Sequence, residues 1–310
     1  MRIAIVGQQD FGKAVLEAFL ARGDEVAGVF CAPEKPGARP DALKVAAQEK
    51  GVKVFQFASL KSDEAKAALR GLDAEIGVMA YVLQFAPQDF VNIPARGTIQ
   101  FHPSLLPKYR GPSSINWPIA RGDGRTGLTI FRPNDGLDEG PVILQKETHI
   151  GPDDTLGTVY FDRLFPMGVQ AMLEAADLVA AGKHRERVQD ESQATYEGWF
   201  RDAEARIHWA SHADAIYNLV RAANPAPGAW TTLAGVKLQI FDARKHRVRT
   251  FGAVKGKIGE VVEASAASFQ VSAQGGRIEV LRAKLGEGKK IAAAELIASG
   301  AIKAGQLLGT

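Results

Sequence analysis

The first hundred residues of the chain alternate short apolar runs with segments of helical periodicity. The apolar runs predict strands at residues 3–6, 25–30, 52–56, 76–80 and 97–101. Helical periodicity between the first four runs predicts helices at residues 13–22, 42–51 and 63–69. Strands joined through helices pair in parallel, because the helix carries the chain back to the start of the next strand. The pattern therefore predicts an α/β fold with a mostly parallel, doubly wound sheet.

The stretch before residue 200 is expected to complete this first domain. Apolar runs at 127–131 and 142–147 predict two further strands, and residues 155–181 predict one long amphipathic helix. The polar stretch 183–195 predicts a connection between domains. We therefore expect a first domain at residues 1–200 and a second at 201–310.

The second half of the chain contains short apolar runs separated by turns. One helix is predicted at residues 213–223, and strands are predicted at 236–241, 256–262, 268–272 and 277–283. Short strands without helices between them indicate a small β-barrel or sandwich, for which an OB-like barrel is one option. The alanine-rich stretch 291–304 predicts a peripheral helical segment.

The composition argues against several classes of function. The 310 residues carry 38 basic and 35 acidic side chains, mixed along the chain, for a net charge of +3. This balance argues against a nucleic-acid-binding tail or a membrane-binding patch. Cys31 is the single cysteine, so no internal disulfide and no multi-cysteine metal site is expected. With no apolar stretch of about 18 residues, the sequence predicts no signal peptide and no membrane span, and we expect a cytoplasmic location.

The segment GQQDFGKA at residues 7–14 directly follows the first predicted strand. It matches the phosphate-binding pattern GxxxxGK, but Ala14 stands where a serine or threonine hydroxyl would hold magnesium. The glycines of such a segment either serve a phosphate or let a strand turn tightly into a helix. Ala14 argues against a kinase or an ATPase.

Polar side chains suited to catalysis follow the strand predicted at residues 97–101. Gln100 and His102 are two residues apart, so their side chains face the same side of a strand that Pro103 ends. Open α/β sheets bind their ligands at this carboxyl edge. Asp138 offers a carboxylate that would orient the imidazole and stabilise its protonated form. A purely structural role for His102 fits the same spacing.

At these residues the chain resembles a known family. FHPSLLPKYRG at 101–111, INW at 115–117, GLTIF at 127–131 and GLDEG at 136–140 are similar to motifs of the 10-formyltetrahydrofolate-dependent formyltransferases and hydrolases. TYEG at 195–198, EARIHW at 204–209 and NPAPGAW at 224–230 extend the resemblance over essentially the whole chain. The resemblance implies a Rossmann-like catalytic domain, an OB-like C-terminal domain and a folate that carries one carbon as its N10-formyl group.

The resemblance also implies site residues. The family's Asn-x-His…Asp constellation falls on Gln100, His102 and Asp138. The implied folate-binding residues are Tyr81, Val82, Leu83, Gln84, Phe85, Ala86, Ser104, Leu105, Leu106 and Pro107. The implied loop on the side of the formyl acceptor contains Gly7, Gln8, Gln9 and Phe11. The formyl donor would be 10-formyltetrahydrofolate, and we expect no metal and no nicotinamide cofactor.

Gln100 departs from the family's transferases, which carry Asn at that position. The longer side chain places its amide about 1.5 Å beyond the oxyanion position unless the backbone retreats. Gln100 is therefore either a displaced, dispensable amide or the working oxyanion donor. The hydrolase domain of 10-formyltetrahydrofolate dehydrogenase also lacks this Asn, and GQQDFG at 7–12 and RLFP at 163–166 resemble that domain as well.

The sequence leaves the formyl acceptor open. We expect a hydrolase or a formyltransferase of the dehydrogenase-like branch, acting on water or a small amine, with an amino sugar as a further option. Methionyl-tRNA formyltransferase is the alternative. The basic residues of the loop 32–44 are only Lys35, Arg39 and Lys44, and Glu34 and Asp41 offset their charge. This loop would therefore bind RNA weakly. A non-catalytic folate-binding module is the alternative from another class, and the retained His–Asp pair argues against it.

Four other residues carry narrower expectations. Lys108 and Arg110 could meet the glutamate tail of folate or remain solvated in their loop. His208 and His212 have i, i+4 spacing, but a helix cap is expected there rather than a metal site.

Overall fold

The computed structural model describes residues 1–248 and 255–309, and the chain divides into two compact units. The first unit contains Met1–Gly111, Gly127–Thr148 and Phe161–Tyr196. The second contains Pro112–Thr126, His149–Tyr160 and Glu197–Thr310. The predicted domain boundary after residue 200 stays a prediction. Two short stretches from the first part of the sequence, 112–126 and 149–160, pack with the second unit.

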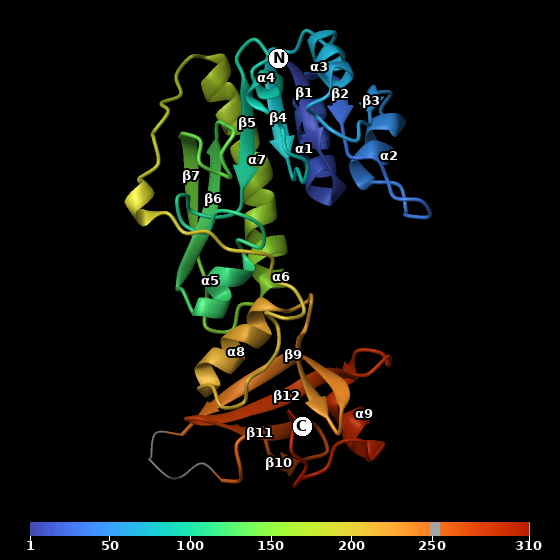
Figure 1. The fold of residues 1–310 in the computed structure, drawn as a ribbon, viewed down its shortest axis with the longest axis vertical. Coiled ribbons are helices and arrows are strands. Elements are labelled where there is room, and N and C mark those ends of the chain that lie inside the picture. The colour runs from blue at the N-terminus through green and yellow to red at the C-terminus, as the bar shows by residue number, and fades with distance from the viewer. Residues whose placement is uncertain (249–254, 310) are drawn as a thin grey trace. The chain divides into compact units, whose positions relative to one another are not determined.

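A seven-stranded sheet forms the first unit (Figure 1). Its strands are β1 (Arg2–Gly7), β2 (Glu25–Phe30), β3 (Val54–Phe55), β4 (Ile76–Ala80), β5 (Thr98–His102), β6 (Arg125–Phe131) and β7 (Val142–His149). They lie in the order β3-β2-β1-β4-β5-β6-β7. The pairs from β3 through β5 are parallel, whereas β6 runs antiparallel to β5. The predicted mostly parallel α/β sheet is confirmed.

Helices cover both faces of this sheet, because successive strand residues point to opposite sides. Ile3 and Ile5 of β1 lie in a core with α1 (Gln9–Ala21), α2 (Ala42–Glu49) and α7 (Phe165–Ala180). Ala4 and Val6 lie in a second core with α3 (Asp63–Arg70) and α4 (Gln88–Val91). The sheet is therefore doubly wound, as the sequence predicts.

The two glycines of the GQQDFGKA segment serve close packing rather than a turn. Gly7 is the last residue of β1, and a Cβ atom there would lie 2.1 Å from the carbonyl oxygen of Ala80 on β4. Gly12 is buried within α1, and a Cβ atom there would lie 3.0 Å from Leu43 of α2. The expectation that both are turn residues is wrong. The left-handed residue of the turn is Gln9, with a φ of 59°.

The segment predicted as one helix at residues 155–181 is divided. It consists of α6 (Leu156–Val159), a π-helical turn η1 (Tyr160–Leu164) and α7. Pro166 lies in the first turn of α7 and has no N–H, so the carbonyl of Asp162 four residues earlier lacks its helical donor. The register of hydrogen bonds changes there, and periodicity alone does not reveal such a change.

The second unit is built on an antiparallel sheet. Its strands are β8 (Ala229–Leu233), β9 (Val236–Arg247), β10 (Val261–Ala264), β11 (Phe269–Ala273), β12 (Gly276–Leu285) and β13 (Ile291–Ala292), and its main helices are α5 (Asn116–Arg121), α8 (Ala213–Ala222) and α9 (Ala293–Ala298). The order is β10-β11-β12-β9-β8, with β13 beside β12. Backbone bonds from Leu308 to Gly259 and from Gly309 to Thr232 link the two edges through the C-terminal segment. This closure is barrel-like, as expected.

Two sequence expectations for the second unit have clear outcomes, and one strand was missed. The strand β8 was not predicted, because its run AWTTL is short and follows a proline-rich turn. The strand expected at 256–262 begins only at Val261, because residues 256–259 form bends and turns and Glu260 forms an isolated bridge. The helix cap expected at His212 is confirmed, since its Nδ1 accepts from the backbone N–H of Asp214 over 3.2 Å at the start of α8.

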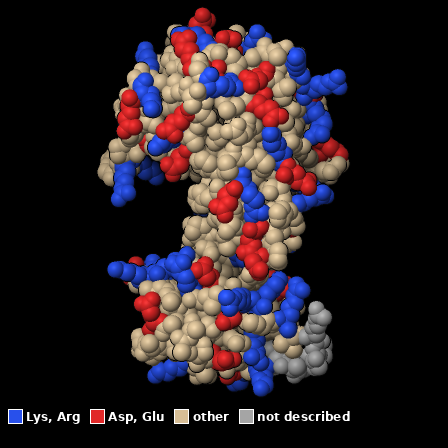
Figure 2. Space-filling view, turned by 180° about the vertical axis from the view of Figure 1, so that it is seen from behind, with Lys and Arg blue, Asp and Glu red and all other residues tan. Residues whose placement is uncertain are grey.

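Charged side chains of both signs are mixed on the surface. Figure 2 shows basic and acidic groups interspersed over the face that it draws, in agreement with the near balance of 38 basic and 35 acidic residues. Among the residues that the structure describes, no helix combines the length and the apolar character needed to cross a membrane.

The loop between β2 and α2 is held by the carboxylate of Glu34. Gln56 and Lys44 donate to its Oε2 over 2.9 and 3.0 Å, and the backbone N–H of Asp41 donates to its Oε1 over 3.2 Å. The hydrogen bond from Gln56, together with that from Lys44, lowers the pKa of Glu34 to about 2. The carboxylate is therefore ionised in the folded protein at neutral pH.

We expect Glu34→Gln to lower the thermal midpoint near pH 7 by an amount that shrinks as the solution is acidified. The folded-state pKa of about 2 lies below the unfolded value, about 4.3, so this stabilisation is present above the unfolded value and is lost as the pH falls through the folded one. Glutamine keeps the size of the side chain and an accepting oxygen. Thermal denaturation followed by circular dichroism measures the effect. A midpoint difference that stays constant from about pH 7 to about pH 3 would contradict the assignment.

Candidate active site

Strand β5 carries two polar side chains to the carboxyl edge of the sheet. Gln100 lies opposite Met79 of β4 and Phe131 of β6, and His102 lies opposite Thr129 of β6. Gln100 is half-buried, and within the described part of the chain its side-chain amide has no hydrogen-bond partner. An amide whose donors are unused beside a buried imidazole is available to a bound molecule.

The imidazole of His102 is buried and oriented by two contacts. Its Nε2 lies 2.8 Å from the carbonyl oxygen of Tyr109, and its Nδ1 lies 3.5 Å from Oδ2 of Asp138. A carbonyl only accepts, so Nε2 carries a proton and donates it to Tyr109. Nδ1 therefore faces the carboxylate at 3.5 Å, slightly beyond the range of a good hydrogen bond, and both atoms can act as acceptors for a molecule that lies beside the pair. The pair that the sequence predicted, His102 and Asp138, is brought together.

Asp138 is held in an uncommon backbone conformation. Its φ is 56°, in the left-handed region that costs a non-glycine residue free energy. Its Oδ2 accepts from the backbone N–H of Gly111 over 2.8 Å, and the side chain is only 8% exposed. Surrounding contacts must therefore fix both the backbone and the carboxylate of this residue.

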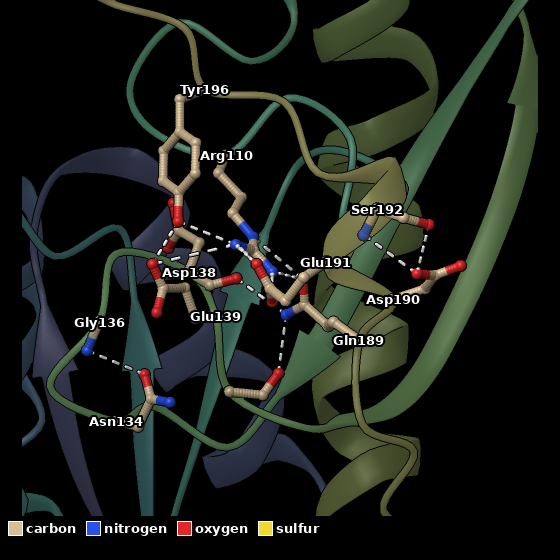
Figure 3. A network of polar contacts seen from close by, with 11 residues as sticks. Arg110, Asn134, Gly136, Asp138, Glu139, Gln189, Asp190, Glu191, Ser192 and Tyr196 are labelled. Atoms are coloured by element: carbon tan, nitrogen blue, oxygen red, sulfur yellow. Dashed lines mark hydrogen bonds and ion pairs between the residues drawn. The ribbon is translucent and has the colours of Figure 1, made fainter.

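Those contacts begin at Arg110, whose side chain is fully buried. Figure 3 shows its guanidinium among Gln189, Glu191 and Tyr196. Its guanidinium donates to both carboxylate oxygens of Glu191 over 2.6 and 2.9 Å and to the hydroxyl of Tyr196 over 2.8 Å. The hydrogen bonds with Glu191, followed by the one with Tyr196, raise the pKa of Arg110 above its usual range. Both expectations for Arg110, a contact with the glutamate tail of folate and a solvated charge, are wrong. Lys108, in contrast, is exposed.

Gln189 connects this cation to the loop of Asp138. Its Oε1 accepts from Nε and Nη2 of Arg110 over 3.2 and 2.9 Å. Its Nε2 donates to the backbone carbonyls of Asp138 and Gly140 over 2.8 and 2.7 Å. The stretch 183–195, expected to be only a connection, thus supplies a residue that positions the candidate catalytic loop. No local sequence pattern predicts this role of Gln189, because its contact with Asp138 spans 51 residues of sequence.

The segment 81–86 alternates between exposed and packed residues at the end of β4. Tyr81, Leu83 and Phe85 are 39%, 56% and 49% exposed. Val82 packs against the core that contains Ala86, and Gln84 donates to the backbone carbonyls of Phe57 and Ala58 over 2.9 and 3.1 Å. Exposed apolar side chains grouped at the carboxyl edge are typical of a ligand surface. Val82 is a poor probe of such a surface, because its substitution would also disturb the core.

Hydrogen bonds within the first unit hold the segment 104–107 in place. Ser104 is fully buried and donates to the carbonyl of Lys108 over 2.7 Å, and Leu106 is buried with its carbonyl accepting from Gln145 over 2.7 Å. Leu105 and Pro107 are partly exposed. Side-chain contact with a ligand is therefore open to Leu105 and Pro107, whereas the side chains of Ser104 and Leu106 are buried against neighbouring residues.

The segment predicted on the acceptor side lies at the point where the strand order reverses. The chain proceeds outward from β1 to β3 and then returns to β4 on the other side of β1, and ligands bind at such switch points. Gln8 is half-buried and Gln9 is exposed at this edge. Phe11 is buried against Phe101, with ring centroids 4.3 Å apart, so it belongs to the core.

We expect Gln189→Leu to destabilise the fold by about 1 to 3 kcal/mol, because two buried carbonyls and the Arg110 guanidinium lose their partners. Amide hydrogen exchange should accelerate at residues 136–140. Denaturant unfolding and exchange mass spectrometry measure the two effects. Gln193→Leu is the matched control, since Gln193 is exposed in the same connection. Equal effects of the two substitutions would show that Gln189 does not fix the loop.

Two family descriptions match the chain. The description "Formyl transferase" matches residues 1–176, and "Formyl transferase, C-terminal domain" matches residues 200–300. Together they extend over both parts of the sequence.

Curated relatives of two kinds are similar to the chain. The cytosolic 10-formyltetrahydrofolate dehydrogenase of Mus musculus is 42% identical over 248 residues, which is 78% of this chain but only 27% of that protein. The chain therefore spans about a quarter of the length of that relative. The methionyl-tRNA formyltransferase of Geotalea uraniireducens (strain Rf4) is 32% identical over 314 residues, covering 100% of this chain and 98% of that protein.

A solved structure shares the fold. HypX from Aquifex aeolicus in complex with tetrahydrofolic acid matches with a TM-score of 0.66 at 18% identity, covering 96% of this chain and 47% of that chain. At this identity the similarity concerns the fold alone.

Proposed function

Because the chain belongs to the formyl transferase family, we propose that it removes the formyl group of 10-formyltetrahydrofolate and passes it to water or a small amine. Water is the favoured acceptor. One observation carries the proposal: a buried pair, His102 and Asp138, lies at the carboxyl edge beside Gln100, whose side-chain amide has no partner among the described residues. This arrangement provides a proton acceptor and an oxyanion donor at one place.

The residues would act in a defined order. The attacking water lies beside Oδ2 of Asp138 and Nδ1 of His102, and this pair takes one of its protons as its oxygen bonds to the formyl carbon. Gln100 donates a hydrogen bond to the formyl oxygen as negative charge develops there. The proton then passes to N10 of the folate as the bond between carbon and N10 breaks. The products are formate, a proton and tetrahydrofolate.

The exposed face of segment 81–86 fits the folate. Tyr81, Leu83 and Phe85 provide apolar area for a pterin ring, and the backbone groups beside them can read its donors and acceptors. The segment follows β4, and β4 pairs directly with the strand that carries Gln100. A ring bound there would place the formyl group of the donor toward the His102–Asp138 pair.

Methionyl-tRNA formyltransferase is the second candidate, because the relative of that name matches the chain from end to end. The charges of the loop 32–44 argue against strong binding of RNA. Lys44 is paired with Glu34 at 3.0 Å, which leaves Lys35 and Arg39 as the cations of this loop that could neutralise phosphates. A purely folate-binding module would not need the buried His102–Asp138 pair, so a catalytic function is favoured.

We expect the purified chain to release formate from 10-formyltetrahydrofolate without an added acceptor and Asp138→Asn to reduce this rate at least about a hundredfold. The asparagine keeps the shape but not the charge that accepts the proton. Asp135→Asn, three residues earlier in the same loop and exposed, is the matched control and should retain the rate. Transfer to charged initiator tRNA with no formate release would instead establish the second candidate.

We expect Gln100→Leu to reduce turnover about a hundredfold, corresponding to ~3 kcal/mol of transition-state stabilisation, with little change in folate affinity. Leucine keeps most of the bulk and removes every donor. Because no residue that the structure describes uses this amide, the role of oxyanion donor is favoured over that of a dispensable side chain. Steady-state kinetics and a folate-analogue titration separate the two quantities. Undiminished formate release would show that Gln100 is dispensable.

A further inference from the structure

The N-terminus of α1, where the GQQDFGKA segment would cradle a phosphate, already holds a carboxylate of the protein itself. The backbone N–H of Gln9, the first residue of α1, donates to Oδ1 and Oδ2 of Asp41 over 3.0 and 2.9 Å. The same carboxylate accepts from the backbone N–H of Leu43 over 2.9 Å and caps α2. Asp41 thus satisfies the starts of two helices at once.

The charges around this turn oppose an external anion. Asp10 lies in the first turn of α1, and Glu34 accepts from the backbone N–H of Asp41 over 3.2 Å. The lysine of the GxxxxGK pattern, Lys13, lies 3.9 Å from Glu17, one turn further along the helix. Lys44 is paired with Glu34. A phosphate at the end of α1 would therefore meet carboxylates, and these two lysines already have acidic partners.

This turn is close to the candidate catalytic residues. Gly7 of β1 lies opposite Ala80 of β4, and Met79 of β4 lies opposite Gln100 of β5. The end of β1 and Gln100 are therefore separated by two strand spacings, about 10 Å. A formyl acceptor attacking the carbon beside Gln100 would extend over the turn at Gln8 and Gln9.

We propose that Asp41 determines acceptor specificity by occupying the anion-binding end of α1, so that acceptors bearing phosphate are excluded and water or an uncharged amine is used. This inference rests on the formyl-transfer function proposed above. The left-handed φ of 59° at Gln9 directs its N–H to the carboxylate, and the same contact stabilises that conformation. The exclusion is therefore built into the turn.

Asp41→Asn tests the proposal with inorganic phosphate as the probe. Asparagine is an equally good helix cap, so α2 keeps its start while the charge is removed. We expect phosphate to shift the backbone amide resonance of Gln9 in the variant with at least about tenfold higher affinity than in the unchanged chain. Phosphate should also inhibit formate release more strongly in the variant.

Asp63→Asn is the matched control, because Asp63 is an exposed carboxylate in the first turn of α3. It should leave the phosphate response of Gln9 unchanged. Equal phosphate affinity at Gln9 in the unchanged chain and in Asp41→Asn would overturn the proposal, as would an equal gain in the control. The resonance titration needs no turnover, so absent formate release together with the expected titration would reject the proposed function alone.

Discussion

A fully buried guanidinium ties the chain segment 189–196 to the loop that carries Asp138, and the geometry of the candidate site depends on this contact. Arg110 is paired with Glu191 and hydrogen-bonded to Gln189, which donates to the carbonyls of Asp138 and Gly140. A buried cation is costly unless every donor is paired, so the segments around it are fixed together. Asp138 can then remain in a left-handed conformation with its carboxylate 3.5 Å from His102.

The two sides of the candidate site differ in whether their polar groups already have hydrogen-bond partners within the protein. On the donor side, Gln100 has an amide that no described residue uses, and Tyr81, Leu83 and Phe85 expose apolar surface. On the acceptor side, Asp41 already satisfies the helix start that a phosphate would need. Under the proposed function, unused donors on one side of the site and an occupied anion position on the other favour a small, uncharged acceptor.

The features of the fold and the site that depend on local sequence pattern were predictable. The alternation of apolar runs and helical segments predicts the parallel strands, and Pro103 after Gln100 and His102 indicates that both side chains lie at the carboxyl edge. Contacts over long sequence distances were not predictable in this way. Gln189 lies in a polar stretch without periodicity, and Asp41 lies in a loop 32 residues from the amide that it accepts from. Gly7 illustrates the same limit. Only glycine fits there, because a Cβ atom would clash with the carbonyl oxygen of Ala80 on β4, far away in the sequence.

The central claim is that the formyl group is attacked between Gln100 and the His102–Asp138 pair. A crystal structure of the chain with a non-reactive formyl folate analogue tests it most directly. The account predicts the formyl oxygen within about 3.1 Å of the Gln100 amide nitrogen, with the formyl carbon facing Asp138 and the pterin against Tyr81, Leu83 and Phe85. An ordered analogue whose formyl group lies away from Gln100 and His102 would contradict it.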